Sequence, residues 1–241
     1  MHPSFRAEAE GGAACGADLE QALAEYGFRL LGAFIPEEDD GIPALPDGGR
    51  TQAVILVGNA GPGMWAAFQR GRRDEKDPLD SWTRRVIEPL AANLGLGVVF
   101  PFAGPPWAPF QRWAERCGTM FPSPIGISIH PRYGTWFGMR AALLADALPE
   151  VPSFAEESPC AACADKPCLA ACAIRAANGG EYDAGRCIDR LKTIEGHGCL
   201  KNGCQSRHAC PVGQDYAYGR EQAEFHMRAF VATYGPIVHG F

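Results

Sequence analysis

The sequence predicts an α+β protein with a cysteine-rich module near its C-terminal end, and three observations support that fold class. Short apolar runs such as Ala53–Val57 and Val98–Phe102 have the length and composition of buried strands. Residues 18–26 and 80–94 instead carry apolar side chains at helical spacing. Eight of the ten cysteines lie in the last third of the chain. At 241 residues, 46% of them apolar, the chain is long enough for one large domain with a small appendage.

Glycine and proline divide the body into helices and strands. Gly27 and Gly95 follow runs with helical spacing and act as stop signals, and Asp80 or Ser81 is expected to cap the second helical run. The glycine-rich stretch 58–63 lacks the spacing of a phosphate loop or a dinucleotide fingerprint, so we interpret it as a plain turn. The expected elements are, in order, a helix over 18–26, strands over 28–35 and 53–57, helices from 64 and over 80–94, a strand over 98–102, a helix over 105–117, and strands over 125–130 and 136–144.

Three prolines and three acids between Pro149 and Pro159 mark the end of the body. Beyond the cysteines, apolar side chains return at helical spacing and predict a C-terminal helix that packs back on the body. The predicted parts are the body over residues 1–152, the cysteine module over 153–213, and the C-terminal helix segment over 214–241.

Composition excludes some classes of partner. A formal net charge of −6 argues against stable nucleic-acid binding, because that binding draws its affinity from clustered Lys and Arg. The basic run 70–73 is followed at once by Asp74 and Glu75, so it is expected to be a solvated loop. With no long apolar run and no signal-peptide pattern at the N-terminus, we expect a cytoplasmic protein without membrane insertion.

The cysteine spacing predicts iron–sulfur ligation. Reduced thiols in a chain without a secretory signal are interpreted first as metal ligands. In two-cluster ferredoxins, three cysteines of a run bind one cluster and the fourth binds the other, and a Cys-Pro pair closes the pattern. The expected ligands of two [4Fe–4S] clusters are Cys160, Cys163, Cys168 and Cys210 for one cluster and Cys172, Cys187, Cys199 and Cys204 for the other.

Alternatives to this assignment remain open. The loop after Cys163 is two residues longer than usual, and Cys172 lacks the customary following proline. Structural zinc sites also use four cysteines, although zinc modules usually contain two C-x2-C knuckles. His197 and His208 lie among the cysteines and have the ring nitrogens to replace one as ligand, but eight thiols already suffice. The two cysteines outside the module, Cys15 and Cys117, are expected to be ordinary thiols.

The module resembles a known family. Residues Cys187–Glu195 are similar to the segment between the ferredoxin cysteines of epoxyqueuosine reductases, and the likeness runs from about Pro149 to Pro211. The resemblance implies cobalamin and two [4Fe–4S] clusters. Those enzymes place a catalytic aspartate where this chain has residues 105–109, which contain no acid, and their tRNA-binding repeat domain is missing. Epoxide reduction on tRNA is therefore disfavoured.

The body resembles a second family. The stretch Ile129–Arg140 is similar to the core motif of the cytosolic cobalamin-processing proteins, which remove the upper ligand of cobalamin, and Asp77–Asp80 adds a supporting match. By this resemblance Arg140 faces glutathione, a corrinoid amide or a phosphate, against the alternative of a surface arginine at a strand end. His130 is either a polar group beside the corrinoid or a satisfied core histidine. The corrinoid-binding residues that the resemblance implies are His130, Arg132, Tyr133, Gly134, Trp136 and Arg140.

Both resemblances imply a nitroreductase-like α+β body joined to a ferredoxin-like module. The function they favour is a reductase that binds cobalamin and reduces its cobalt so that the upper axial ligand departs. A ferredoxin, a flavodoxin or a flavin reductase would supply the electrons, and glutathione is a further candidate partner. Two alternatives stay open: a cobalamin-dependent reductase of another small substrate, and a non-catalytic carrier of electrons or corrinoid.

Overall fold

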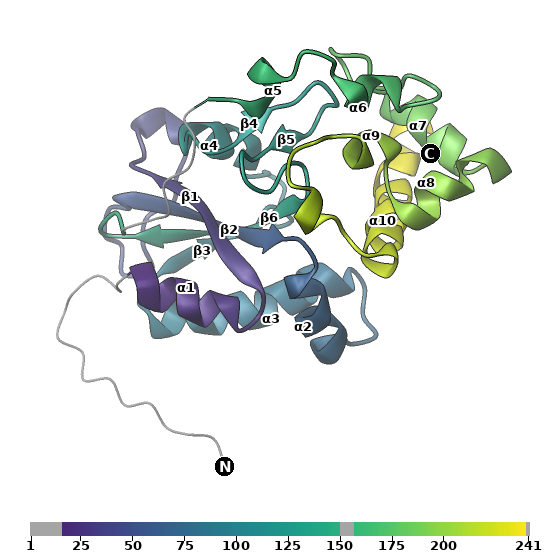
Figure 1. Ribbon diagram of the computed structural model, residues 1–241. Helices are drawn as coiled ribbons and strands as arrows, with labels where there is room; N and C mark the ends of the chain where they lie inside the picture. Colours follow the sequence, from purple (N-terminus) through teal and green to yellow (C-terminus); the bar gives the residue numbers. More distant parts are fainter. Residues whose placement is uncertain (1–15, 150–156, 240–241) are drawn as a thin grey trace.

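The computed structural model describes residues 16–149 and 157–239 and shows a mixed helix-and-sheet fold (Figure 1). A four-stranded antiparallel sheet forms the centre of the body, and the cysteine module lies to one side of it. The strand order is β1-β2-β6-β3, and every pairing is antiparallel. The strands are β1 (Phe28–Phe34), β2 (Ala53–Ala60), β6 (Phe137–Ala145) and β3 (Gly97–Val99).

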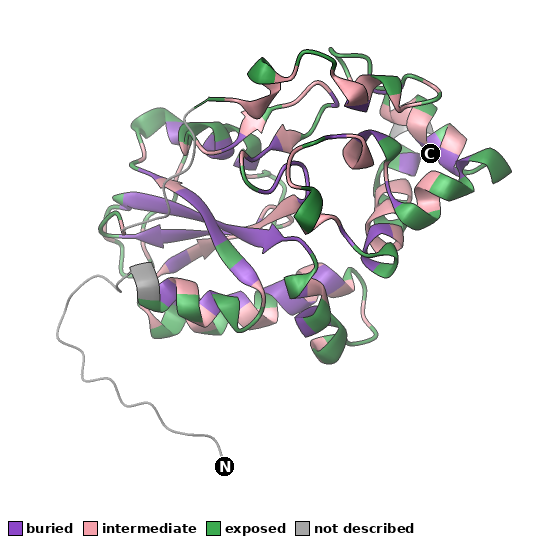
Figure 2. Ribbon diagram, in the orientation of Figure 1, coloured by how far each residue is buried: buried purple, intermediate pink, exposed green. Residues whose placement is uncertain are grey.

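Strand β2 is the centre of the core, because all eight of its residues are buried. Alternate side chains point to opposite faces of the sheet, so that Ile55 joins one apolar cluster and Leu56 joins the other. The two strands β2 and β6 come so close at a register shift that a Cβ on Gly58 would lie 2.2 Å from the carbonyl oxygen of Gly138. Figure 2 shows this buried sheet beneath a mostly exposed outer surface.

Helices cover both faces of the sheet. On one face, Leu19, Phe68 and Ile87 of three helices pack with Ile55. On the other face, Trp113 packs with Leu56, and its indole N–H donates to the carbonyl of Asp40 at 3.0 Å. The first three helices are α1 (Gly16–Ala24), α2 (Gly63–Gly71) and α3 (Pro78–Asn93), and the opposite one is α4 (Phe110–Arg116).

Proline explains where the structure departs from the expected elements. The helix expected from residue 105 begins only at Phe110, because three prolines in 105–109 supply no N–H and restrict the residues before them. Helix α3 begins at Pro78, earlier than expected, because proline is well suited to the first turn. The expected strand 125–130 shrinks to β5 (Ser128–Ile129), which pairs with β4 (Phe121–Pro122).

The segment after the last cysteine is not one helix. A short 3-10 turn, η3 (Gln214–Tyr216), is followed by Gly219 and then by α10 (Arg220–His239). Helix α10 packs against helices of the module, and its Phe225 ring lies 5.2 Å from the ring of Trp65 in the body. It therefore contacts both parts of the molecule.

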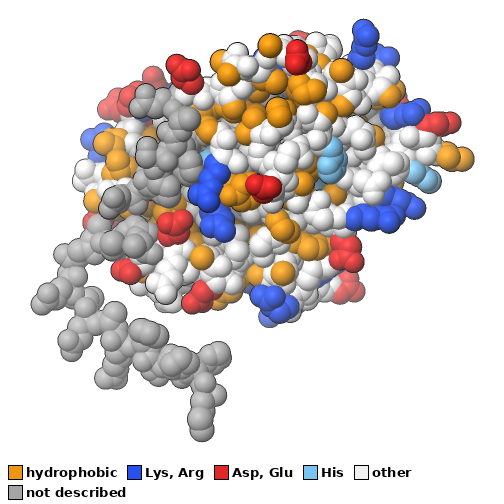
Figure 3. Space-filling view, viewed as in Figure 1, with side chains coloured by type: hydrophobic (Ala, Val, Ile, Leu, Met, Phe, Trp, Pro, Cys, Tyr) orange, Lys and Arg blue, Asp and Glu red, His pale blue; other side chains and the backbone are white. Residues whose placement is uncertain are grey.

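The module consists of short helices joined by tight turns. They are α5 (Pro159–Ala162), α6 (Pro167–Ala170), α7 (Ala184–Leu191), η2 (Ile194–Gly196), α8 (His197–Asn202) and α9 (Gln205–His208), and η1 (Glu38–Asp40) lies in the body. None of the described helices has the length and apolar character to cross a membrane. On the face in Figure 3, Lys and Arg side chains are interspersed with Asp and Glu.

Candidate metal centres

Six cysteines of the module lie at or near the ends of its short helices, and Cys187 and Cys199 lie within α7 and α8. Pro159 and Pro167 occupy the first turns of α5 and α6, where the missing N–H of proline does no harm. The hydroxyl of Ser158 caps α5 by accepting the N–H of Cys160 at 3.3 Å. Lys166 adopts a left-handed conformation, and its ammonium donates to the carbonyls of Cys160 and Cys163. These contacts hold the first loop of cysteines in a closed turn.

Four thiols form one interacting group. Burial raises the pKa of Cys160, and Cys210 and Cys168 raise it further. Burial also raises the pKa of Cys168, to which Cys210 and Cys163 add. Thiols raise one another's pKa only when they are close, because each thiolate repels the next. Cys210 thus lies close to Cys160 and Cys168 although it is the last of the eight in sequence.

The other four thiols form a second group. Burial raises the pKa of Cys187 to about 11, a hydrogen bond from Tyr182 lowers it, and Cys204, Cys172 and Cys199 raise it. The pKa of Cys199 is raised by burial and by the same neighbours, Cys204 and Cys172. These thiol–thiol interactions join members of the same group.

Backbone N–H groups surround one sulfur of the second group. Burial alone would raise the pKa of Cys172, but hydrogen bonds from the backbone at Ala177, Ala176, Ile174 and Arg175 lower it overall. Arg175 has a positive φ of 53°, which turns successive N–H groups toward one centre. A concave set of N–H groups stabilises a negatively charged sulfur, as is found around iron–sulfur centres.

These observations bear on the kind of metal that fits. Within residues 16–149 and 157–239, no three His, Cys, Asp or Glu side chains meet closely enough to hold a single metal ion. In a zinc site, four sulfurs lie about 2.3 Å from one ion, whereas a four-iron cluster is larger and spaces its thiolates more widely. Two groups of four thiols, one of them with an N–H concavity, suit two [4Fe–4S] clusters.

The predicted corrinoid residues lie where the body meets the module. We call this contact the seam, formed by residues 129–140 of the body and residues 205–226. The His130 ring is buried, and its Nδ1 accepts the backbone N–H groups of Arg132 at 3.0 Å and Tyr133 at 3.3 Å. Burial and the charge of Arg132 lower the pKa of His130 to about 4, so this imidazole is neutral at pH 7. His130 therefore organises the turn that follows it.

At the seam, the backbone of residues 133–134 lies very close to the backbone of residues 212–213. A Cβ on Gly134 would lie 2.0 Å from the carbonyl oxygen of Val212, and one on Gly213 would lie 2.2 Å from the carbonyl carbon of Tyr133. Trp136 is 1% exposed, with its ring 4.8 Å from that of His208 in α9. Tyr133 and Trp136 are thus interior residues, covered by α9 and by Tyr216 and Tyr218 in the chain after Cys210.

A chain of polar contacts crosses the seam at Arg140. The Arg140 guanidinium donates through Nε to Asn59 Oδ1 at 3.2 Å and lies 3.6 Å from the carboxylate of Asp80. Asn59 Nδ2 donates in turn to the hydroxyl of Tyr218 at 2.9 Å. Burial lowers the pKa of Arg140 and raises that of Asp80, and the attraction between the two opposes both effects. Arg140 is therefore a partly buried, paired arginine.

We expect Asn59→Ala to destabilise the folded protein by roughly 2–4 kcal/mol, because it leaves the Arg140 guanidinium and the Tyr218 hydroxyl short of a partner. Denaturant unfolding measures the loss. Tyr218→Phe is expected to cost less, about 1–2 kcal/mol, since only one bond is lost. The double variant should fall short of the sum by about 1 kcal/mol. Strict additivity would mean that the two side chains do not act together.

The seam also makes stability depend on pH. Burial and the charges of Arg140 and Arg207 lower the pKa of His226 to about 3. The unfolded chain takes up a proton on this ring near pH 6.5, so the free energy of unfolding should fall as pH drops from about 6.5 toward 3. His226→Gln is expected to remove a share of that fall, on the order of a few kcal/mol. Exposed His197→Gln is the control, and an equal slope in all three proteins would contradict the assignment.

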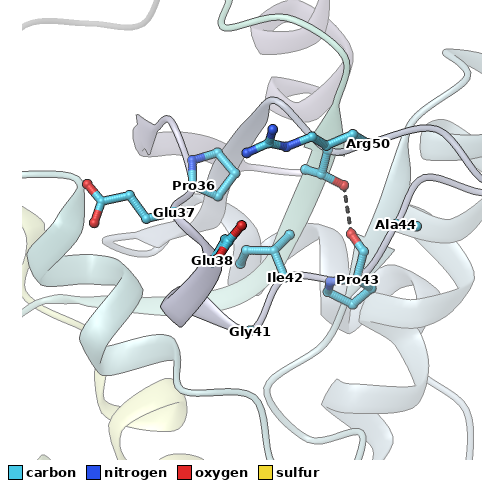
Figure 4. Close-up of a pocket in the computed structure, with 9 residues that line it drawn as sticks. Pro36, Glu37, Glu38, Gly41, Ile42, Pro43, Ala44 and Arg50 are labelled. Carbon is cyan, nitrogen blue, oxygen red and sulfur yellow. Dashed lines mark hydrogen bonds between the residues drawn. The ribbon is translucent and has the colours of Figure 1, made fainter.

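A pocket of about 450 Å³ lies away from these residues, in the connection between β1 and β2 (Figure 4). Arg50 and Glu38 face it from opposite sides, and the hydroxyl of Thr51 donates to the carbonyl of Pro43 at 2.7 Å. None of the predicted cysteine or corrinoid residues lines this pocket.

Sequence reasoning missed three residues of the site. Tyr182 binds Cys187, Lys166 holds the first cysteine loop, and Arg207 reaches the carbonyl of Thr135 at the seam. A lysine or arginine beside cysteines has no fixed spacing that marks it. Cys15 lies outside the described residues, and Cys117 is partly buried in the body, where desolvation raises its pKa to about 12.

The body, the seam and the two thiol groups define a mixed helix-and-sheet protein with a C-terminal module rich in cysteine. Among solved structures, the B12-trafficking protein CblC of C. elegans, a human MMACHC homologue, is similar at 19% identity and a TM-score of 0.49, over 89% of this chain and 90% of that one. An epoxyqueuosine reductase is similar at 16% identity and a TM-score of 0.46, over 86% of this chain and 69% of that one. The epoxyqueuosine reductase from Streptococcus thermophilus is similar at 14% identity and a TM-score of 0.45, over 84% of this chain and 67% of that one. No protein-family model and no curated protein sequence matches the chain.

Proposed function

We propose that this chain is an iron–sulfur reductase with two [4Fe–4S] clusters that reduces the cobalt of cobalamin, so that the upper axial ligand departs. The observation that carries the proposal is the division of eight thiols into two interacting groups of four. Bound clusters would supply one-electron chemistry at low potential. The protein's part is to hold the thiolates, to exclude water and to set the charge around the sulfurs.

The corrinoid part of the proposal rests on the motif at the seam. The stretch 129–140, which resembles the core motif of cobalamin-processing proteins, packs directly on α9 between Cys204 and Cys210. Electrons that reach either cluster would therefore arrive next to this motif. His130, Tyr133 and Trp136 are interior in this conformation and do not form an open cradle for a macrocycle. We assign these three residues to the architecture of the site and derive no step on the corrinoid from them.

A thiol cosubstrate is less well supported by the same geometry. The Arg140 guanidinium is already engaged by Asn59 and Asp80, so glutathione would have to compete with a carboxylate for it. An external electron donor of the ferredoxin, flavodoxin or flavin reductase class and a reducing intracellular compartment complete the proposal.

The test is an anaerobic titration of the iron-replete protein with cob(II)alamin, followed by EPR of the clusters and of cobalt. We expect about eight irons per chain and a cobalt signal that shifts to the base-off form. Reduced protein should then convert cyanocobalamin to the decyanated form. Reduced clusters that leave cob(II)alamin and cyanocobalamin unchanged would contradict the corrinoid proposal, and protein without iron would contradict the cluster proposal.

A second candidate function is favoured by the burial of the motif. A protein whose corrinoid motif is closed under the chain after Cys210 would serve as an electron carrier of the ferredoxin type. Full cluster reduction without cobalamin binding would establish that function. Cobalamin that stays bound through purification, but is not consumed, would instead indicate a resident cofactor for reduction of another small substrate.

A further inference from the structure

Arg207 lies on the helix between Cys204 and Cys210 in the sequence, and its side chain points toward the body. It belongs to α9, three residues after Cys204 and three before Cys210, which are members of different groups. Its guanidinium donates to the carbonyl of Thr135 and lies 4.4 Å from the ring centre of Trp136 and 4.9 Å from that of Tyr218. The side chain is thus held between two aromatic rings at the seam.

The positive charge of Arg207 has no carboxylate partner among the residues that the structure describes. Its Nε is buried and has no hydrogen-bond partner in that part of the chain. Arg140, which acts on the same His226 ring as Arg207, is paired with Asp80. A partly buried charge without a counter-charge is costly, so an arginine held here indicates a source of negative charge nearby.

The proposed clusters are that source. A [4Fe–4S] cluster with four thiolate ligands is anionic, and it becomes more so when it accepts an electron. A fixed positive charge on the helix that joins a ligand of one cluster to a ligand of the other favours the reduced form and raises the reduction potential, since net charge is among the factors that set it. Cation–π contact with Trp136 and Tyr218 keeps the guanidinium in place without neutralising it.

We propose that Arg207 is the shared counter-charge of the two clusters and a positioning residue that sets how readily they are reduced. The inference rests on the proposed function, because it requires that the clusters are present. It assigns to α9 a role in addition to the placement of Cys204 and Cys210: the helix carries the charge that links the clusters electrostatically to Trp136 of the body.

The experiment is an anaerobic potentiometric titration monitored by EPR, on the wild type, Arg207→Gln, Arg207→Lys and the control Arg228→Gln. Arg228 is an exposed arginine on α10 that pairs with Glu224. Its replacement removes the same charge as Arg207→Gln, but at a position outside the seam. At a fixed potential, we expect the ratio of reduced to oxidised cluster in Arg207→Gln to fall about tenfold, which is about 59 mV for a one-electron couple. Arg207→Lys should stay near the wild type, and Arg228→Gln should not change.

Each outcome decides the inference. An unchanged midpoint in Arg207→Gln with eight irons bound overturns it, and so does an equal shift in Arg207→Lys, which keeps the charge. If Arg207→Gln loses its iron while Arg207→Lys retains it, a requirement for the charge is supported. Iron loss from both variants indicates a purely geometric role and overturns the inference. Wild-type protein that takes up no iron refutes the proposed function itself, which is a separate result.

Discussion

Replacement of Cys210 by serine is expected to remove one cluster and leave the other, so that iron falls from about eight to about four atoms per chain. The reason is the crossed grouping, in which Cys210 interacts with Cys160 and Cys168, whereas its sequence neighbour Cys204 interacts with Cys187 and Cys199. Cys172→Ser should likewise remove a single cluster, in this case the one held by Cys172, Cys187, Cys199 and Cys204. Iron analysis and EPR of the remaining cluster measure both results.

Double variants separate crossed from sequential pairing. Under the crossed assignment, Cys168→Ser with Cys210→Ser damages a single cluster, and about four irons remain. If the first four cysteines held one cluster and the last four the other, the same pair would damage both. Cys117→Ser is the control, because this partly buried thiol belongs to the body and its replacement should leave the iron content unchanged. Loss of all iron from the double variant would refute the crossing.

Replacement of Gly134 by alanine is expected to open the seam and to cost roughly 3–5 kcal/mol of unfolding free energy. The new Cβ would lie 2.0 Å from the carbonyl oxygen of Val212, and the backbone holds a φ of 59° that alanine tolerates poorly. We expect a lower denaturation midpoint, together with faster hydrogen exchange in residues 129–140 and 211–218. This experiment tests whether the body and the module are held together at this contact.

Gly118→Ala is the matched control for Gly134. Gly118 has a similar φ of 66°, but a Cβ added there would meet nothing within 4 Å, so only the backbone cost of about 1 kcal/mol applies. The difference between the two variants isolates the contact with Val212. Equal losses of unfolding free energy would show that the contact with Val212 adds no cost and that only the backbone conformation at Gly134 requires glycine.

The parts of the fold that were predictable from sequence are those governed by local pattern. The strand expected over 53–57 is the first part of β2, and the strand expected over 136–144 is β6 within a residue. Apolar composition over a short run suffices to mark such elements. The helix expected from residue 105 failed because three local restrictions by proline outweigh apolar spacing.

In the candidate site, too, some residues were predictable from the sequence and others were not. Cysteine spacing pointed to metal ligation because thiolates at short intervals have few other uses in a reduced chain. Spacing carried no information on Lys166, Tyr182 or Arg207, since each acts on a group brought near by folding. It also could not show that Trp136 is covered by His208 of α9 and by Tyr218 after Cys210.

The sequence by itself determined the mixed helix-and-sheet class, the cysteine module and the stretch 129–140 as a candidate motif, because composition, spacing and periodicity are properties of neighbouring residues. Only the tertiary structure decided which thiols interact, that Arg140 is paired with Asp80, and that Arg207 stands without a carboxylate partner in the described chain. Those facts depend on the seam, where residues far apart in the chain meet at backbone distance. Electrostatic interaction depends on separation in space, and separation in space at this point is set by packing between the two parts.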